Sequence, residues 1–222
     1  ELGRLLDSID LGEIQLDENG HYEIWLGGEP RDHNWLALEE GACVLLGRQC
    51  FSDWDQQRLG AMSIERMDAV RVESPSLSSA QMVGRLRQTA SLLRNQVNFW
   101  QQYIGPWCQR PVNTLSQPNW TEGGVANQMI STGWVSLDPG QALLVEVPHC
   151  AVRYQGFQLG HRWWFNTFDY RCRQSSLNGS QAQRSADGVY RYVISMEDPG
   201  VVNWLDTEGH RQALVSIRWQ GI

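Results

Sequence analysis

The chain has 222 residues, a hydrophobic fraction of 41% and a formal charge of -7, with an isoelectric point of about 5.2. This length and composition are those of a soluble globular protein that can bury a full core. No basic block is present to contact phosphates, which argues against nucleic acid and against a polybasic membrane anchor. All 18 basic residues are arginine, which excludes lysine Schiff-base chemistry and the lysine of a phosphate-binding loop.

Five scattered cysteines contain no Cys-x-x-Cys pair, which argues against a zinc knuckle or a thioredoxin-type site. They are expected to be small buried thiols in a reducing compartment. The sequence shows no signal peptide and no apolar run long enough to cross a bilayer. We therefore expect a cytoplasmic protein with no bound metal or other cofactor. Membership of a homo-oligomer or of a longer chain stays open.

The N-terminal third is predicted to be a mixture of short elements. Apolar residues at helical spacing predict an amphipathic helix over residues 1–10. A turn at 18–20 and an alternating pattern over 22–26 predict a strand that ends at a Gly-Gly-Glu-Pro sequence. A loop containing Trp54 is expected over 51–60, and further strands are predicted over 42–49, 61–66 and 69–73.

One long helix is predicted over residues 76–104. Ser78 and Gln81 are spaced for a capping box at its start, and the Gly105-Pro106 pair is expected to end it. Its apolar face is expected to pack on a sheet. That face consists of residues spaced by three and four positions, namely Met82, Val83, Leu86, Ala90, Leu93, Val97, Trp100 and Ile104.

After the helix, a long polar loop is expected over 111–124. The remaining chain is rich in strand patterns separated by turn signals. The resulting prediction is a mainly β protein with one compact unit over residues 1–222, an antiparallel β-sandwich of jelly-roll type with the helix inserted. The strands are predicted over 134–137, 142–147, 152–159, 190–195 and 213–220.

Part of the sequence occurs twice, in segments at about 19–48 and 187–218, the second lying in the region 133–222. The tripeptide Asn34-Trp35-Leu36 matches Asn203-Trp204-Leu205, and the flanking Gly20, Pro30, Gly41 and Arg48 match Gly188, Pro199, Gly209 and Arg218. An element used twice must satisfy the same local geometry twice. We therefore interpret the shared residues as structural and expect function where the second copy differs.

The differences gather acidic residues and a histidine in the second copy. Asp206 replaces Ala37, His210 replaces Ala42, and Asp198 and Glu208 lie in the same loop. A carboxylate beside an imidazole can act as an acid–base pair or can orient a metal-bound histidine. The competing interpretation is that these loop carboxylates are solvated or cap turns. The candidate catalytic residues are Asp206, His210 and Asp198.

A second set of candidates surrounds an aromatic run at 163–165, which His161, Asp169 and Tyr170 flank. Such residues can line a pocket for a sugar face or a flat apolar ligand, although a plain aromatic core explains most of the 11 tryptophans. The candidate ligand-binding residues are Asp169, Tyr170, Trp204, Arg218 and Trp164.

The segment from Tyr154 to Arg218 resembles a bacterial family known as domain of unknown function 1214. The resemblance implies a β-rich, sandwich-like fold in a soluble bacterial protein, and it implies no catalytic residues. A proline often follows Asn-Trp-Leu in that family, whereas Asp206 stands there in this chain. The motifs that carry the resemblance are Tyr154-Gln155-Gly156-Phe157-Gln158-Leu159, Asp169-Tyr170, Ser176-Leu177-Asn178, Asp187-Gly188, Asp198-Pro199-Gly200, Asn203-Trp204-Leu205 and Ile217-Arg218.

Three functions remain open from the sequence. The first is binding of a small carbohydrate or aromatic ligand near the second copy. The second is a hydrolase that uses an Asp/His pair in the same loop. The third is a scaffold or accessory subunit whose helix and tryptophans contact partners.

Overall fold

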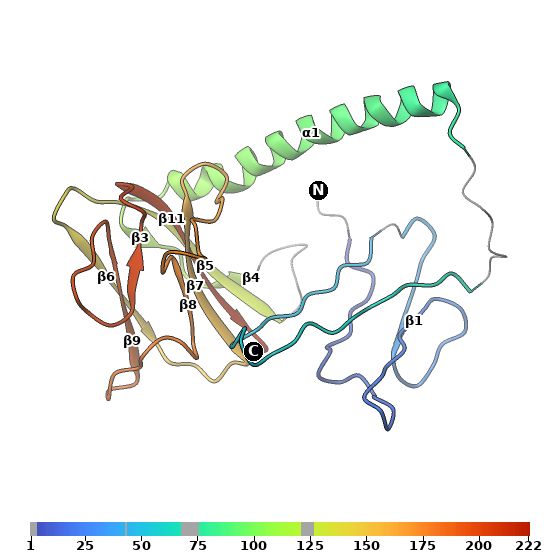
Figure 1. The fold of residues 1–222 in the computed structure, drawn as a ribbon, viewed down its shortest axis with the longest axis horizontal. Helices are drawn as coiled ribbons and strands as arrows, with labels where there is room; N and C mark the ends of the chain where they lie inside the picture. Colours follow the sequence, from blue (N-terminus) through green and yellow to red (C-terminus); the bar gives the residue numbers. More distant parts are fainter. Residues whose placement is uncertain (1–3, 43, 68–75, 121–126) are drawn as a thin grey trace.

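A computed structural model describes residues 4–42, 44–67, 76–120 and 127–222. Figure 1 shows a β-rich C-terminal lobe, a looser N-terminal lobe formed by residues 4–67, and the helix α1 extending from the first above the second. None of the described segments combines the helical length and apolar character that a membrane span requires.

A six-stranded sheet forms the larger part of the C-terminal lobe. Its order is β3-β5-β11-β7-β8, with β4 also pairing with β5, and all of these pairs are antiparallel. The central strand β11 lies between the two other long strands. The strands are β3 (Thr114–Leu115), β4 (Asn119–Trp120), β5 (Gln128–Ser136), β7 (Tyr154–His161), β8 (Ser176–Asn178) and β11 (Gln212–Gln220).

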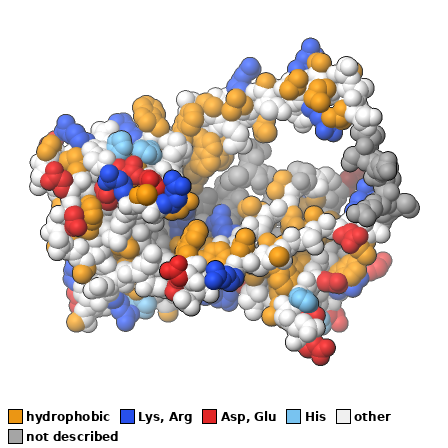
Figure 2. Space-filling view, viewed as in Figure 1, with side chains coloured by type: hydrophobic (Ala, Val, Ile, Leu, Met, Phe, Trp, Pro, Cys, Tyr) orange, Lys and Arg blue, Asp and Glu red, His pale blue; other side chains and the backbone are white. Residues whose placement is uncertain are grey.

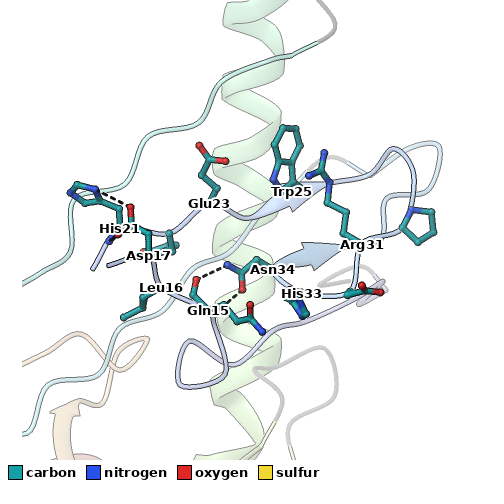
Figure 3. A pocket seen from close by; sticks show the side chains of 12 residues that line it. Gln15, Leu16, Asp17, His21, Glu23, Trp25, Arg31, His33 and Asn34 are labelled. Atoms are coloured by element: carbon teal, nitrogen blue, oxygen red, sulfur yellow. Dashed lines mark hydrogen bonds and ion pairs between the residues drawn. The ribbon is translucent and has the colours of Figure 1, made fainter. Parts of the chain in front are cut away.

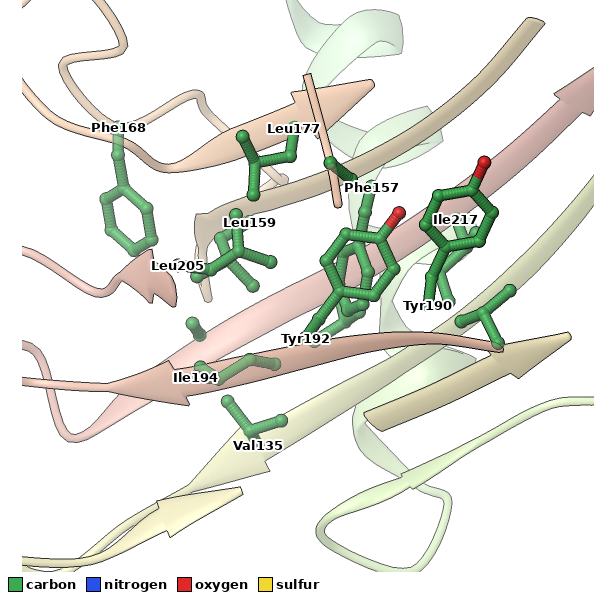
Figure 4. Packing of buried hydrophobic residues seen from close by; sticks show 14 of the residues in the cluster. Val135, Phe157, Leu159, Phe168, Leu177, Tyr190, Tyr192, Ile194, Leu205 and Ile217 are labelled. Atoms are coloured by element: carbon green, nitrogen blue, oxygen red, sulfur yellow. The ribbon is translucent and has the colours of Figure 1, made fainter. Parts of the chain in front are cut away.

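A three-stranded sheet packs against it through one apolar core. Strand β9 (Val189–Ser195) lies between β6 (Ala142–Pro148), which is antiparallel to it, and β10 (Trp204–Asp206), which is parallel. Figure 4 shows residues of both sheets meeting in the core. The five strands predicted from the C-terminal half are confirmed, as is the mainly β composition.

The two faces of β11 explain how this lobe is assembled. Alternate residues of a strand point to opposite faces, and Val215 and Ile217 face the main core. Leu214, on the other face, packs with the end of α1. A buried polar chain links the sheets, because Trp219 donates to Gln155 over 3.0 Å and Gln155 donates to Tyr192 over 3.1 Å. Satisfied polar groups of this kind restrict how two sheets can slide against each other.

Helix α1 spans Ser79–Cys108, and the predicted capping box of Ser78 and Gln81 is confirmed. The prediction that Gly105-Pro106 ends the helix is wrong, because both residues lie within its last turn. A proline here loses one intrahelical hydrogen bond and its ring crowds the carbonyl of Gln102, but burial of Ile104 and Trp107 against Leu214 stabilises that turn. The expected packing of the whole apolar face is also wrong, since these are the only buried residues of the helix.

The N-terminal lobe has little regular structure. Its two strands, β1 (Trp25–Leu26) and β2 (Trp35–Leu36), form a short parallel pair. Among residues 4–67, Leu36 is the only buried hydrophobic residue in the part that the structure describes. Without a core, apolar side chains at helical or strand spacing have no apolar surface to pack against. The predicted helix over 1–10 and the strands over 42–49 and 61–66 are therefore absent from the described residues, and the prediction over 69–73 lies outside them.

Asn34 and Asn203 occupy the same local structure in the two lobes. Each has a left-handed backbone, with φ of 49° and 57°, and immediately precedes a short strand that pairs in parallel. The Asn34 amide group bonds both backbone groups of Gln15 over 2.9 and 2.8 Å. The Asn203 amide group does the same to Gln183 over 2.7 Å in each direction.

Two other expectations are corrected. The region 111–124 was expected to be one polar loop, but it contains β3 and β4, which add to the edge of the large sheet beside β5. The cysteines were expected to be buried, but Cys50, Cys150 and Cys172 are exposed and Cys108 is half-buried. Partial burial nevertheless raises the pKa of the Cys150 thiol.

Candidate metal centre

Three side chains with metal-ligating chemistry converge at one end of the large sheet. His161 ends β7, while Glu208 and His210 lie in the turn between β10 and β11. One ligand atom from each residue lies within 4.8 Å of the other two. A tetrahedral ion held about 2.1 Å from its ligands needs donors roughly 3.4 Å apart, so each pair of ligand atoms has to approach by at most about 1.4 Å. Neither this set nor any metal was predicted from the sequence.

The turn that presents Glu208 and His210 is fixed by its backbone. The His210 amide donates to the Thr207 carbonyl over 2.9 Å, and the two central residues, Glu208 and Gly209, have φ of 54° and 74°. Positive φ at both central positions defines a type I′ turn. A left-handed conformation costs a non-glycine residue about 1–2 kcal/mol, so the position of Glu208 must be stabilised by its surroundings.

Asp206 supplies much of that stabilisation. This buried carboxylate accepts the Glu208 amide over 2.7 Å and the Arg173 guanidinium over 2.9 Å. Its hydrogen bond with Asp206 raises the pKa of Arg173. Because both Asp206 oxygens are engaged, we assign this predicted catalytic residue to positioning the turn.

Aromatic contacts hold the two imidazole rings. The buried ring of Phe168 lies 4.4 Å from His161, edge to face, and 5.6 Å from His210 in a stacked arrangement. The imidazoles are 5.0 Å apart, between ring centres. The backbone amide of His161 also donates to the Asn166 carbonyl over 2.7 Å. The rings are thus restricted before any ligand binds, which reduces the entropy lost on binding.

The carboxylate of Glu208 also has a defined partner, because it accepts the backbone amide of Asp169. Burial acts to raise the pKa of the Asp169 carboxyl, but hydrogen bonds from Cys172 and Arg171 outweigh it and lower that pKa. The same hydrogen bond raises the pKa of the Cys172 thiol. The nearby charges of Glu208 and Asp169 also contribute to the raised pKa of Arg173, so a guanidinium already lies close to these carboxylates.

A second strained turn stands next to the centre. Trp164 and Phe165 have φ of 60° and 57° in the loop that follows His161. Bulky residues rarely adopt this conformation, and such outliers concentrate at functional sites. The turn leaves Trp163 and Trp164 exposed, and Tyr170 is exposed further along the same loop.

The remaining predicted site residues lie elsewhere. Asp198 is exposed and accepts the Gly200 amide over 2.8 Å, as expected for a turn cap. Trp204 begins β10, and its indole nitrogen is buried without a hydrogen-bond partner among the described residues. Arg218 lies six residues along β11 from its first residue, Gln212, which is roughly 20 Å on an extended strand and places it far from His210. Burial and the neighbouring Arg48 lower the pKa of Arg218.

The structure therefore places His210 beside two residues that were not among the predicted catalytic or ligand-binding residues, His161 and Glu208, and the Asp169 backbone amide bonds Glu208. The sequence pointed to His161 only as a residue that flanks the aromatic run at 163–165. The residue becomes informative only when β7 is paired with β11, because that register sets His161 opposite Ala213, three residues after His210.

A separate depression of about 800 Å³ lies in the N-terminal lobe. Figure 3 shows Trp25, Arg31, His33 and Asn34 around it. The Arg31 guanidinium lies 3.6 Å from the centre of the Trp25 ring and so covers its face. The Trp25 ring is therefore occupied on that face, and Tyr22 is the other aromatic residue that lines the depression.

The chain is similar to the crystal structure of an uncharacterised protein from Burkholderia cenocepacia. The two share 27% sequence identity with a TM-score of 0.84, over 97% of this chain and 61% of the other. The chain thus spans about 61% of the length of that neighbour. No family model and no curated protein matches the chain, so the resemblance to domain of unknown function 1214 stays a prediction.

Proposed function

We propose that the protein binds a divalent transition metal through His161, Glu208 and His210 and uses it to hold a small, oxygen-rich ligand. The proximity of the three ligand atoms carries this proposal. Imidazole and carboxylate donors suit zinc and its neighbours in the first transition row. Three protein ligands leave a coordination position for a hydroxyl or carboxylate of the ligand.

Carbohydrates are the first ligand class to test. A sugar presents hydroxyl groups that can coordinate a metal and an apolar ring face that can lie on an aromatic side chain. Trp163, Trp164 and Tyr170 are exposed on the loop that begins at His161. This combination supports the sequence-based expectation of an aromatic-lined binding site in the C-terminal region.

A hydrolase is the second candidate, favoured by the same open coordination position. A zinc ion held by these residues would lower the pKa of a bound water to near neutrality and so would supply a nucleophile for hydrolysis. Under this hydrolase proposal His210 is a metal ligand rather than an acid–base partner of Asp206, because the Asp206 carboxylate already forms an ion pair with Arg173.

The finer description of the fold belongs to the same proposal. We interpret the two sheets as a β-sandwich of jelly-roll type and the segments 19–48 and 187–218 as copies of one unit. The shared apolar core supports the first interpretation. The paired clamps of Asn34 and Asn203 support the second.

Isothermal titration of the metal-free protein with Zn²⁺ and Co²⁺ tests the metal site. We expect one ion per chain and at least a 100-fold loss of affinity in His161→Ala and in His210→Ala, because loss of a ligand exceeds the roughly 10–100-fold effect of losing a supporting residue. His149→Ala is the matched control and should bind normally. No binding by the native chain, or binding unaffected by both substitutions, contradicts the proposal.

The ligand is then tested by a thermal-shift screen of mono- and disaccharides on metal-loaded protein and on protein held in chelator. We expect stabilisation only in the loaded form, with a loss in Trp163→Ala. Equal stabilisation with and without metal would separate the sugar site from the metal site. Turnover of glycoside or ester substrates that is lost in His161→Ala would instead favour the hydrolase.

A further inference from the structure

The first five turns of α1 carry an apolar stripe that nothing in the described chain covers. Its residues recur at alternating three- and four-residue steps, which is the pattern of a helix that packs along its length on another element. Leu86 and Leu93, at its centre, are 62% and 67% exposed. Only the far end of the same stripe is buried, at Ile104.

The N-terminal lobe carries a second set of uncovered apolar residues. They lie in the segments 44–46 and 59–67, which have no regular secondary structure. Figure 2 shows hydrophobic side chains both on the helix and on the lobe that lies below it. The exposed residues of these segments are Val44, Leu45, Leu46, Leu59, Met62, Ile64 and Met67.

The total surface is too large for an isolated compact chain. The protein exposes 16246 Å². A compact monomer of 25.3 kDa is expected to expose about 10,300 Å², so the excess is roughly 6,000 Å². Obligate dimers bury about 2,000–5,000 Å² or more in total. The excess is therefore large enough to supply such an interface from each copy.

Helix α1 and the N-terminal lobe as a whole also have opposite charge, and the acidic excess of the lobe lies in residues 4–42, with ten acidic residues against two arginines. Helix α1 contains three arginines and no acidic residue. Residues 4–67 contain 13 acidic residues against five arginines. Arg87 and Arg94 flank one side of the apolar stripe, where charged side chains select the partner of a packed helix. Two α1 helices would repel each other, whereas α1 and an N-terminal lobe attract.

We propose that two copies of the chain form a reciprocal dimer in which α1 of each packs on the N-terminal lobe of the other. The stripe and the exposed segments of the lobe become the apolar interior of the interface. The arginines of α1 then face the acidic lobe of the partner. This surface is separate from the candidate metal centre, and the two proposals can fail independently.

Light scattering after size exclusion, at about 20 µM, tests the dimer. We expect twice the chain mass of 25.3 kDa for the native protein. The double variant Leu86→Glu/Leu93→Glu should elute as a monomer, and Leu45→Glu/Ile64→Glu should do the same from the other side of the interface. The matched control is Gln88→Glu/Asn95→Glu, which adds the same charge to the opposite face of α1 and should remain dimeric.

The charge contribution is tested with Arg87→Glu/Arg94→Glu. We expect the dimer dissociation constant to rise at least tenfold at low salt and by less in 1 M NaCl, where charges are screened. Circular dichroism of each variant reports whether the chain is still folded. A monomeric native protein, or a dimer unaffected by charges on the stripe, overturns the proposal.

Discussion

The segments 15–42 and 183–210 build the same turn-and-clamp structure in two different environments. In both, the side-chain amide of an asparagine hydrogen-bonds the backbone of a glutamine, and the asparagine immediately precedes a short strand that pairs in parallel. Leu205 of the second segment is fully buried between two sheets, whereas Leu36 is 9% exposed and is the one buried hydrophobic residue among the described residues of 4–67. The comparison separates what local sequence determines from what packing adds.

The largest difference is expected when the two leucines are truncated. Leu205→Ala should lower the free energy of unfolding by about 3–4 kcal/mol, because it leaves a cavity in a closed core. Leu36→Ala should cost about 1–2 kcal/mol, since its surroundings can relax. Urea titration followed by tryptophan fluorescence measures both. Equal losses would mean that Leu36 is packed as tightly as Leu205, for example in the proposed dimer, and dilution below the dimer dissociation constant distinguishes this case.

The asparagine clamps should differ less. Asn203 is buried and also donates to the Arg191 carbonyl over 3.1 Å, so Asn203→Ala should cost about 2–3 kcal/mol. Asn34 is partly exposed and water can replace its bonds, so Asn34→Ala should cost about 1 kcal/mol. Glycine at either position keeps the left-handed backbone without strain and isolates the side-chain contribution. An Asn203→Gly variant less stable than Asn203→Ala would show that the backbone conformation is not the limiting factor.

These clamps show how far local sequence could predict the fold. The capping box at Ser78 and the C-terminal strands follow from periodicity and turn residues, and both were predicted. The absence of strands among the described residues of 42–49 and 61–66 could not be predicted, because an apolar segment forms a strand only where a neighbouring strand and an apolar core are available to it. Pro106 likewise stays helical because Trp107 is buried, a tertiary effect that overrides a local stop signal.

The candidate site was predictable in part for the same reason. His210 was identified because it departs from Ala42 in the matched segment. His161 comes from a strand that has no counterpart in the N-terminal lobe, and only the β7–β11 register brings it to His210. The sequence identified Asp206 because it replaces Ala37 of the first segment. It could not show that the Asp206 carboxylate forms an ion pair with Arg173.

The turn glycines should behave alike in both segments. Gly41 and Gly209 have φ of 88° and 74°, and an added Cβ would meet nothing within 4 Å at either position. Alanine should therefore cost only the backbone penalty, about 1 kcal/mol in each case. Thermal or urea unfolding of the two variants checks this. A clearly larger loss in Gly209→Ala, together with weaker metal binding, would show that the Glu208 turn has tighter requirements than the N-terminal turn.

The smallest effect is expected from rebuilding the histidine in the N-terminal lobe. In a His210→Ala background, Ala42→His would place an imidazole two residues after Glu40, as His210 follows Glu208. We expect no recovery of metal binding by titration with Zn²⁺. His161 and Phe168 lie outside the repeated segment 187–218, so the repeat supplies no counterpart of either, and Glu40 does not share the left-handed backbone of Glu208. Two exposed donors without a third bind a metal far more weakly than three restricted ones. Recovery of native affinity would mean that the turn alone makes the site, and that neither His161 nor the surrounding sheet is required.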